Sequence, residues 1–101
     1  MDYKEIKIKV FLSMQRALLG MIYPEIKMIS VGFDGTKKLT VIYYLDREPN
    51  ESDYENISEV TTLVCADIEF SEVEEICEYL ENSYVKVNSL DGWVYIRQEN
   101  I

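Results

Sequence analysis

Two apolar segments joined by a tight-turn signal constrain the fold of this chain more than any other feature. Asp34-Gly35 is typical of the turn of a short β-hairpin, and it lies between the segments Ile26–Phe33 and Lys38–Leu45. The second segment is apolar on both of its faces, which is typical of a strand in the interior of a sheet. The chain is therefore expected to build a sheet around this hairpin.

A helix is expected after the second of these segments. Ser52 and Glu55 form a capping-box pattern after Pro49, and acidic residues at this place favour the positive end of a helix dipole. The apolar side chains that follow recur at helical spacing: Ile57, Val60, Thr61, Val64, Cys65 and Ile68. This pattern predicts a helix over residues 52–67, with Asp53 exposed in its first turn.

The N-terminal segment carries two competing patterns. Its apolar residues alternate like those of a strand over Ile6–Leu12, and they also recur at helical spacing as far as Met21. Strong helix formers occupy the later part of the segment, and Gly20 stands where a helix would end. We predict a helix from about Lys4 to Leu19.

The segment after the second helix is also compatible with two structures. Residues 70–81 fit either a helix or a strand, but a sheet of only two strands would be marginally stable. We therefore predict a third strand over residues 73–80. Asp91-Gly92 then leads into a fourth predicted strand, Trp93–Arg97.

These elements define the expected fold class, which is α+β. In the order α-β-β-α-β-β they form a two-layer sandwich, in which an antiparallel four-stranded sheet carries both helices on one face. The chain has 101 residues, so a single domain over residues 1–101 is expected.

The charge of the chain changes sign along its length. Residues 1–45 carry seven basic and four acidic side chains, a net +3, whereas residues 46–101 carry three basic and fifteen acidic ones, a net −12. Thirteen of these acids fall within residues 46–81, where Arg47 is the one basic residue. The total of −9 argues against a surface for nucleic acid. The acidic segment is instead a candidate binding face for a basic partner.

Few side chains are available for catalysis or metal binding. The sequence has no histidine, so the commonest general base and the commonest zinc ligand are both absent. Carboxylate pairs such as Glu74 or Glu75 with Glu78 leave a small hydrolase as the remaining enzymatic interpretation. A solvated acidic surface is the better interpretation, so we expect no enzyme, no catalytic residue, no metal and no cofactor.

The expected location is the cytoplasm. The charged opening segment lacks the apolar core of a secretory signal, and no apolar run approaches the roughly 20 residues that span a bilayer. Cys65 and Cys77 stand outside any C-x-x-C spacing, and we expect both to be buried, reduced thiols. No membrane contact is expected.

Aromatic side chains accompany the acids. The chain has eight tyrosines, and tyrosine supplies contact area at an interface while neighbouring acids steer the partner. The expected charge contacts are Glu48, Asp53, Glu55, Glu59, Glu74 and Glu78, and the expected aromatic anchors are Tyr44, Tyr54 and Tyr79. A face of this kind would fit the basic substrate cleft of a nuclease, with carboxylates in place of phosphates.

Five short segments resemble those of one protein family: Gln15–Gly20, Leu45–Pro49, Ser52–Glu55, Val64–Asp67 and Asp91–Tyr95. The family comprises small bacterial immunity proteins of contact-dependent growth inhibition and polymorphic toxin systems. The resemblance implies a cytoplasmic protein that binds and neutralises the C-terminal domain of one cognate toxin, often an RNA-cleaving nuclease. Occlusion of the active site and binding beside it are both compatible with the sequence, as is any oligomeric state. The alternative is an acidic adaptor or regulatory subunit of a cytosolic complex unrelated to toxins.

Overall fold

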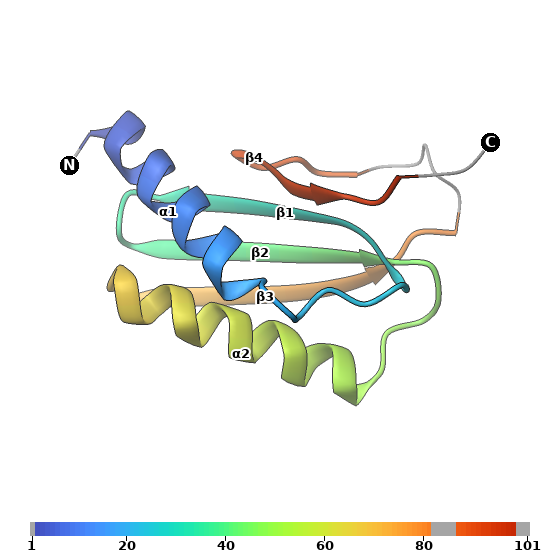
Figure 1. Cartoon of the computed structure of the whole chain (residues 1–101). Coiled ribbons are helices and arrows are strands. Elements are labelled where there is room, and N and C mark those ends of the chain that lie inside the picture. The colour runs from blue at the N-terminus through green and yellow to red at the C-terminus, as the bar shows by residue number, and fades with distance from the viewer. Residues whose placement is uncertain (1, 82–86, 99–101) are drawn as a thin grey trace.

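The hairpin around Gly35 forms the middle of the sheet (Figure 1). β1 (Ile26–Asp34) and β2 (Lys38–Leu45) pair antiparallel, as predicted. Gly35 has a φ of +53°, in the left-handed region that glycine adopts at low cost, and the N–H of Lys37 donates to the carbonyl of Asp34 at 2.8 Å. The local turn chemistry therefore sets the two central strands.

Two further strands extend the sheet on either side of the hairpin. The computed structural model describes residues 2–81 and 87–98, and within them the strand order is β3-β2-β1-β4. β3 (Glu72–Tyr79) pairs with β2, and β4 (Gly92–Ile96) pairs with β1. The predicted strand over residues 73–80 is confirmed, and β2 lies in the interior of the sheet, as its two apolar faces indicated.

The prediction of a fully antiparallel sheet is wrong, because β3 runs parallel to β2. The two strands pair in register from Lys38 opposite Glu72 to Leu45 opposite Tyr79. α2 connects the two strands and carries the chain from the end of β2 back to the level where β2 begins. β3 therefore starts beside the first residue of β2 and runs in the same direction as β2. A strand–helix–strand order is the usual signal for parallel pairing, and it was present in the sequence.

Both predicted helices are present, and they cover the same face of the sheet (Figure 1). α1 (Tyr3–Ala17) ends two residues before the predicted Leu19, and α2 (Glu51–Asp67) begins one residue before the predicted start. The core between the helices and the sheet is apolar. Among its fully buried members are Val10, Met14, Ile29, Val31, Leu39, Val41, Tyr43, Ile57, Val60 and Val64.

The cap of α2 differs from the predicted one. The side chain of Asn50 accepts the N–H of Asp53 at 3.2 Å, and the carboxylate of Asp53 accepts the N–H of Asn50 at 2.8 Å. The capping box is therefore Asn50 with Asp53, and the proposed pair of Ser52 with Glu55 is wrong. Asp53 is also buried, with 1% of its surface exposed, where exposure was predicted.

A second, smaller apolar cluster lies on the face of the sheet that the helices leave open. Its buried members are Ile42, Tyr44 and Leu80, and Trp93 packs beside them. The N–H of Asn88 donates to the hydroxyl of Tyr44 at 2.7 Å, and the ring of Trp93 lies 5.9 Å from that of Tyr44. The segment that leads into β4 therefore covers part of this face.

The cysteines and the helices bear on the expected thiols and on the expected lack of membrane contact. Cys65 and Cys77 are free thiols, as predicted, although Cys65 is only partly buried. Neither α1 nor α2, the helices of the described ranges, has the length and apolar character needed to cross a membrane.

We predict that Gly92→Ala destabilises the fold through a clash with α1. A methyl group at Gly92 would lie 2.6 Å from the Cζ atom of the Phe11 ring, so a close-packed contact would have to yield. The free energy of unfolding should fall by about 1–3 kcal/mol. Phe11→Leu shortens the opposing side chain and should remove most of that penalty in the double variant. Urea unfolding of both single variants and the double variant measures the coupling, and additive losses would contradict the clash.

Candidate partner-binding surface

The acid-rich segment of the sequence gathers along one edge of the molecule. α2 lies along β3, and β3 is the edge strand of the described sheet (Figure 1). These two elements and the turns beside them make up residues 46–81, which carry thirteen acids and one basic residue. The +3 segment forms α1, β1 and β2 instead. The linear separation of charge therefore becomes a separation in space.

An open groove of about 570 Å³ runs between the outer side of α2 and β3. Its lining residues, which we call the acidic groove, are Glu51, Tyr54, Glu55, Ser58, Glu59, Thr62 and Glu75. Glu51, Glu55 and Glu59 are four residues apart, so they form one row with a carboxylate at each turn of the helix. Tyr54, Ser58 and Thr62 form the neighbouring row by the same spacing.

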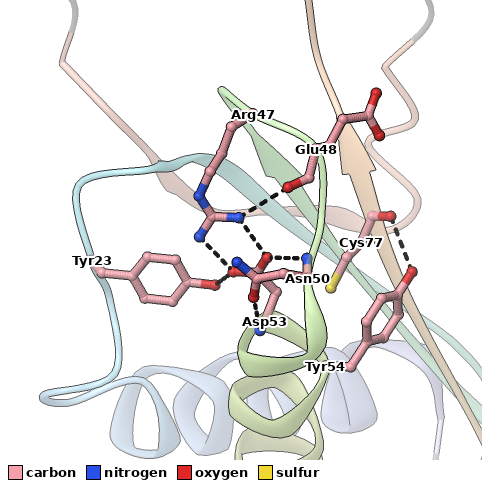
Figure 2. Close-up of polar contacts among 7 residues, drawn as sticks. All are labelled: Tyr23, Arg47, Glu48, Asn50, Asp53, Tyr54 and Cys77. Carbon is pink, nitrogen blue, oxygen red and sulfur yellow. Dashed lines mark hydrogen bonds and ion pairs between the residues drawn. The ribbon is translucent and has the colours of Figure 1, made fainter.

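Hydrogen bonds hold α2 against the sheet beside the groove. The hydroxyl of Thr61 donates to the carboxylate of Glu75, and the hydroxyl of Tyr54 donates to the carbonyl of Cys77 at 3.4 Å (Figure 2). The hydroxyl of Tyr43 donates to Oδ1 of Asn56 at 2.7 Å. The two walls of the groove, α2 and β3, are thus joined directly, and α2 is also bonded to β2 in the core.

The beginning of α2 is anchored by the buried carboxylate of Asp53 (Figure 2). The guanidinium of Arg47 donates to both of its oxygens, at 2.7 and 3.0 Å, and the hydroxyl of Tyr23 donates to Oδ1. With the N–H of Asn50 as a further donor, every side of this carboxylate is occupied. Its pKa falls to about 2, mainly because of the hydrogen bonds from Arg47. Burial and the neighbouring carboxylate raise the pKa of Tyr23.

The structure places three of the predicted contact residues in the acidic groove: Tyr54, Glu55 and Glu59. Tyr54 is the aromatic member, and 46% of its surface is exposed. Two other predicted contact residues are buried and serve the fold. Tyr44 is 2% exposed on the open face of the sheet, and Asp53 is held by Arg47.

The remaining predicted contact residues are exposed outside the groove. Glu74 and Glu78 alternate with the groove residue Glu75 along β3, so their side chains lie on the opposite face of the sheet. Glu74 forms an ion pair with Lys38 at 3.1 Å. Glu48 lies in the turn before α2, and Tyr79 ends β3 with 41% of its surface exposed.

Four residues of the acidic groove were not among the predicted contacts: the acids Glu51 and Glu75, and the hydroxyl residues Ser58 and Thr62. Glu51 stands four residues before Glu55 and belongs to the same row. The predicted helix began at residue 52 and so left Glu51 out, whereas α2 begins at Glu51. Glu75 faces α2 because β3 alternates its side chains across the sheet, and Cys77 on the same face is in the core. Its place depends on the packing of α2 against β3.

The carboxylates of the described ranges differ in burial. Asp53 is the one buried acid among residues 2–81 and 87–98, and its ion pair with Arg47 stabilises the charged form. Acid–base catalysis by two carboxylates needs burial that raises the pKa of one of them. In the same part of the chain, no group of three or more histidine, cysteine or acidic side chains could hold a metal ion.

We predict that Asp53→Asn destabilises the fold in a pH-dependent way. At neutral pH the loss should be about 3 kcal/mol, because Arg47 is left beside a neutral side chain. The folded carboxyl has a pKa of about 2 against an ordinary value of 3.8. Its contribution of about 2 kcal/mol is therefore present above pH 4 and is lost as the pH falls through 2.

Urea unfolding of the wild type and Asp53→Asn at several pH values between 7 and 2 measures this contribution. The difference between the two proteins should narrow as the pH falls. Glu55→Gln on the same helix is the control, because Glu55 is exposed and should change stability by less than about 0.5 kcal/mol. A difference that stays constant across the pH range would contradict the role of the Asp53 charge.

Solved structures with a partly similar arrangement are those of MamM CTD. A copper form of one variant has a TM-score of 0.49 and 15% sequence identity, and the match covers 79% of this chain and 100% of that chain. A zinc form of another variant has a TM-score of 0.49 and 16% identity, over 81% of this chain and 90% of that chain. At these values the likeness carries no conclusion about function.

The comparison that identifies the family is one of sequence. No curated protein sequence matches the chain, but the family model described as MafI2 immunity protein matches residues 7–99. The match spans most of α1 and every later helix and strand of the described structure. The predicted relationship to small immunity proteins of polymorphic toxin systems is thereby confirmed. The chain belongs to the MafI2 immunity protein family.

Proposed function

We propose that this protein binds the C-terminal domain of a cognate toxin in the cytoplasm and neutralises it by covering its substrate cleft with the acidic groove. The toxin domain is a basic, RNA-cleaving nuclease. The observation that carries the proposal is the row of Glu51, Glu55 and Glu59 along α2, opposite Glu75, in a member of an immunity protein family. In this proposal the immunity protein inhibits the toxin by binding alone and catalyses no reaction.

Electrostatics explains why a groove of this kind suits a nuclease. A nuclease holds its substrate through phosphates, so its cleft presents lysine and arginine side chains. Carboxylates spaced along a helix can occupy the positions of those phosphates and exclude the substrate. Since the acids of segment 46–81 are gathered at one edge, they also attract the basic toxin from a distance.

Aromatic side chains complete the surface. Tyr54 and Tyr79 are both about half exposed, and tyrosine buries a large apolar ring while its hydroxyl stays hydrogen-bonded. Tyr54 lies inside the groove, which suits it to be a central anchor. Glu48, Glu74 and Glu78 lie outside the groove and would form the charged rim.

We expect the protein to rescue cells from the toxin encoded by the gene directly upstream. Co-expression with the C-terminal domain of that toxin should restore growth, and the two proteins should purify together. The same toxin domain with an unrelated acidic protein of similar size is the control for non-specific charge effects. Growth arrest that persists at matched expression, without co-purification, would contradict the proposed function and favour a cytosolic adaptor.

We also expect reversal of charge in the groove to slow association with the toxin domain. Glu55→Lys with Glu59→Lys removes two carboxylates from the central row and should lower the association rate by about tenfold at low ionic strength. The dependence of that rate on salt should become shallower. Stopped-flow measurement at low and high salt tests both effects.

The matched control changes the total charge by the same amount away from the groove. Asp34→Lys with Glu5→Lys alters an exposed hairpin residue and an exposed residue of α1. This variant should keep an association rate within about threefold of the wild type. Equal slowing by the two double variants would mean that net charge, and not the acidic groove, governs association.

A further inference from the structure

We propose that the toxin contributes an extended basic segment that pairs with the outer edge of β3 as a fifth strand and lies in the acidic groove. This inference rests on the proposed function, because it requires a basic partner at this edge. It adds the binding mode: main-chain hydrogen bonds hold the segment, and the flanking acids select its side chains.

The backbone of β3 has one side directed at β2 and one side directed away from it. The N–H of Glu72 donates to the carbonyl of Lys37, and the N–H of Leu80 donates to the carbonyl of Leu45, both at 2.8 Å. In a parallel ladder, residues two apart direct their backbone groups to the same neighbour. The even-numbered residues of β3 therefore face β2. The odd-numbered residues direct their backbone groups outward: Val73, Glu75, Cys77 and Tyr79.

The outer edge of β3 is available for pairing. β3 is the terminal strand in the order β3-β2-β1-β4, so no further strand of the described ranges lies beyond it. The outward carbonyl of Cys77 accepts a hydrogen bond from the hydroxyl of Tyr54 at 3.4 Å, which is long for a hydrogen bond that a hydroxyl donates (Figure 2). That contact is easily exchanged for a backbone N–H of an added strand.

The side chains beside this edge decide which strand fits. On the face that carries α2, an added strand would lie next to Glu75 and the row of Glu55 and Glu59. On the other face it would lie next to Glu74 and Glu78. Because successive side chains of a strand alternate between faces, lysine or arginine on either face would meet a carboxylate.

The same acids exclude a second copy of this chain as the occupant. Two β3 edges brought together would place glutamates opposite glutamates, which disfavours pairing. Charged side chains on an exposed edge strand commonly prevent self-association in this way. A basic strand from the toxin would form hydrogen bonds with the outward backbone groups of β3 and ion pairs with the glutamates beside them. A second copy of this chain would form only the hydrogen bonds.

Amide hydrogen exchange of the unmodified protein tests the binding mode directly. In the free protein, the N–H groups of residues 74, 76 and 78 should exchange slowly, and those of 73, 75, 77 and 79 should exchange faster. Addition of the C-terminal domain of the upstream toxin should slow the second set by at least about tenfold. If the complex forms and these outward amides exchange as before, strand addition is wrong and the proposed function stands.

A proline at the edge provides a second test. Val73→Pro removes one outward N–H and leaves the ladder to β2 unchanged, since proline is tolerated on edge strands. The Kd for the toxin domain should rise by at least about tenfold, because a hydrogen bond is lost and the proline ring obstructs the added strand. Val73→Thr keeps the N–H and the β-branched shape, and it should stay within about threefold of the wild type.

The outcomes separate the two proposals. Wild-type protein that neither binds the toxin domain nor restores growth overturns the proposed function and strand addition together. Wild-type protein that binds, with unchanged exchange at residues 73, 75, 77 and 79, overturns strand addition alone. Since the exchange experiment uses the unmodified chain, it decides the question even if Val73→Pro fails to fold.

Discussion

The path of α2 from β2 to β3 is the constraint on which the rest of the structure depends. A helix that returns the chain to the beginning of β2 forces β3 to run parallel to it, and it leaves the helix beside the strand that it leads into. The acidic segment of the sequence therefore lies along one edge of the molecule. There α2 and β3 form the two walls of the acidic groove. The groove, the exposed backbone of β3 and the gathered charge all result from this single connection.

Asp53 holds the start of that connection in place. It is a buried acid in a strongly acidic segment, and its burial is tolerated because Arg47, Tyr23 and the N–H of Asn50 surround its carboxylate. Arg47 is the one basic residue of segment 46–81, and it is used for the fold. Three other acids of that segment, Asp46, Asp67 and Glu74, form ion pairs with Arg97, Arg16 and Lys38. Glu51, Glu55 and Glu59 of the groove are exposed on α2.

Much of the architecture was predictable because it is local. The turn at Gly35, the two apolar faces of β2 and the apolar stripe of α2 each follow from residues that are neighbours in the sequence. The predicted site was only partly correct for a different reason. Asp53 and Tyr44 have the residue types of a contact surface, but they are buried in the fold and hydrogen-bonded there by Tyr23 and by the N–H of Asn88, respectively. Burial by residues that are distant in the sequence leaves no mark on local periodicity.

The sequence by itself determined the elements, the separation of charge into a basic and an acidic part, and the lack of histidine chemistry. Only the tertiary structure decided which glutamates share one groove and which acid is buried. The physical reason is that burial and the lining of a groove depend on contacts between elements, such as those of α2 with β2 and β3, which belong to no single segment of the chain. Glu55 and Glu75 stand twenty residues apart in the sequence and line one groove in the fold.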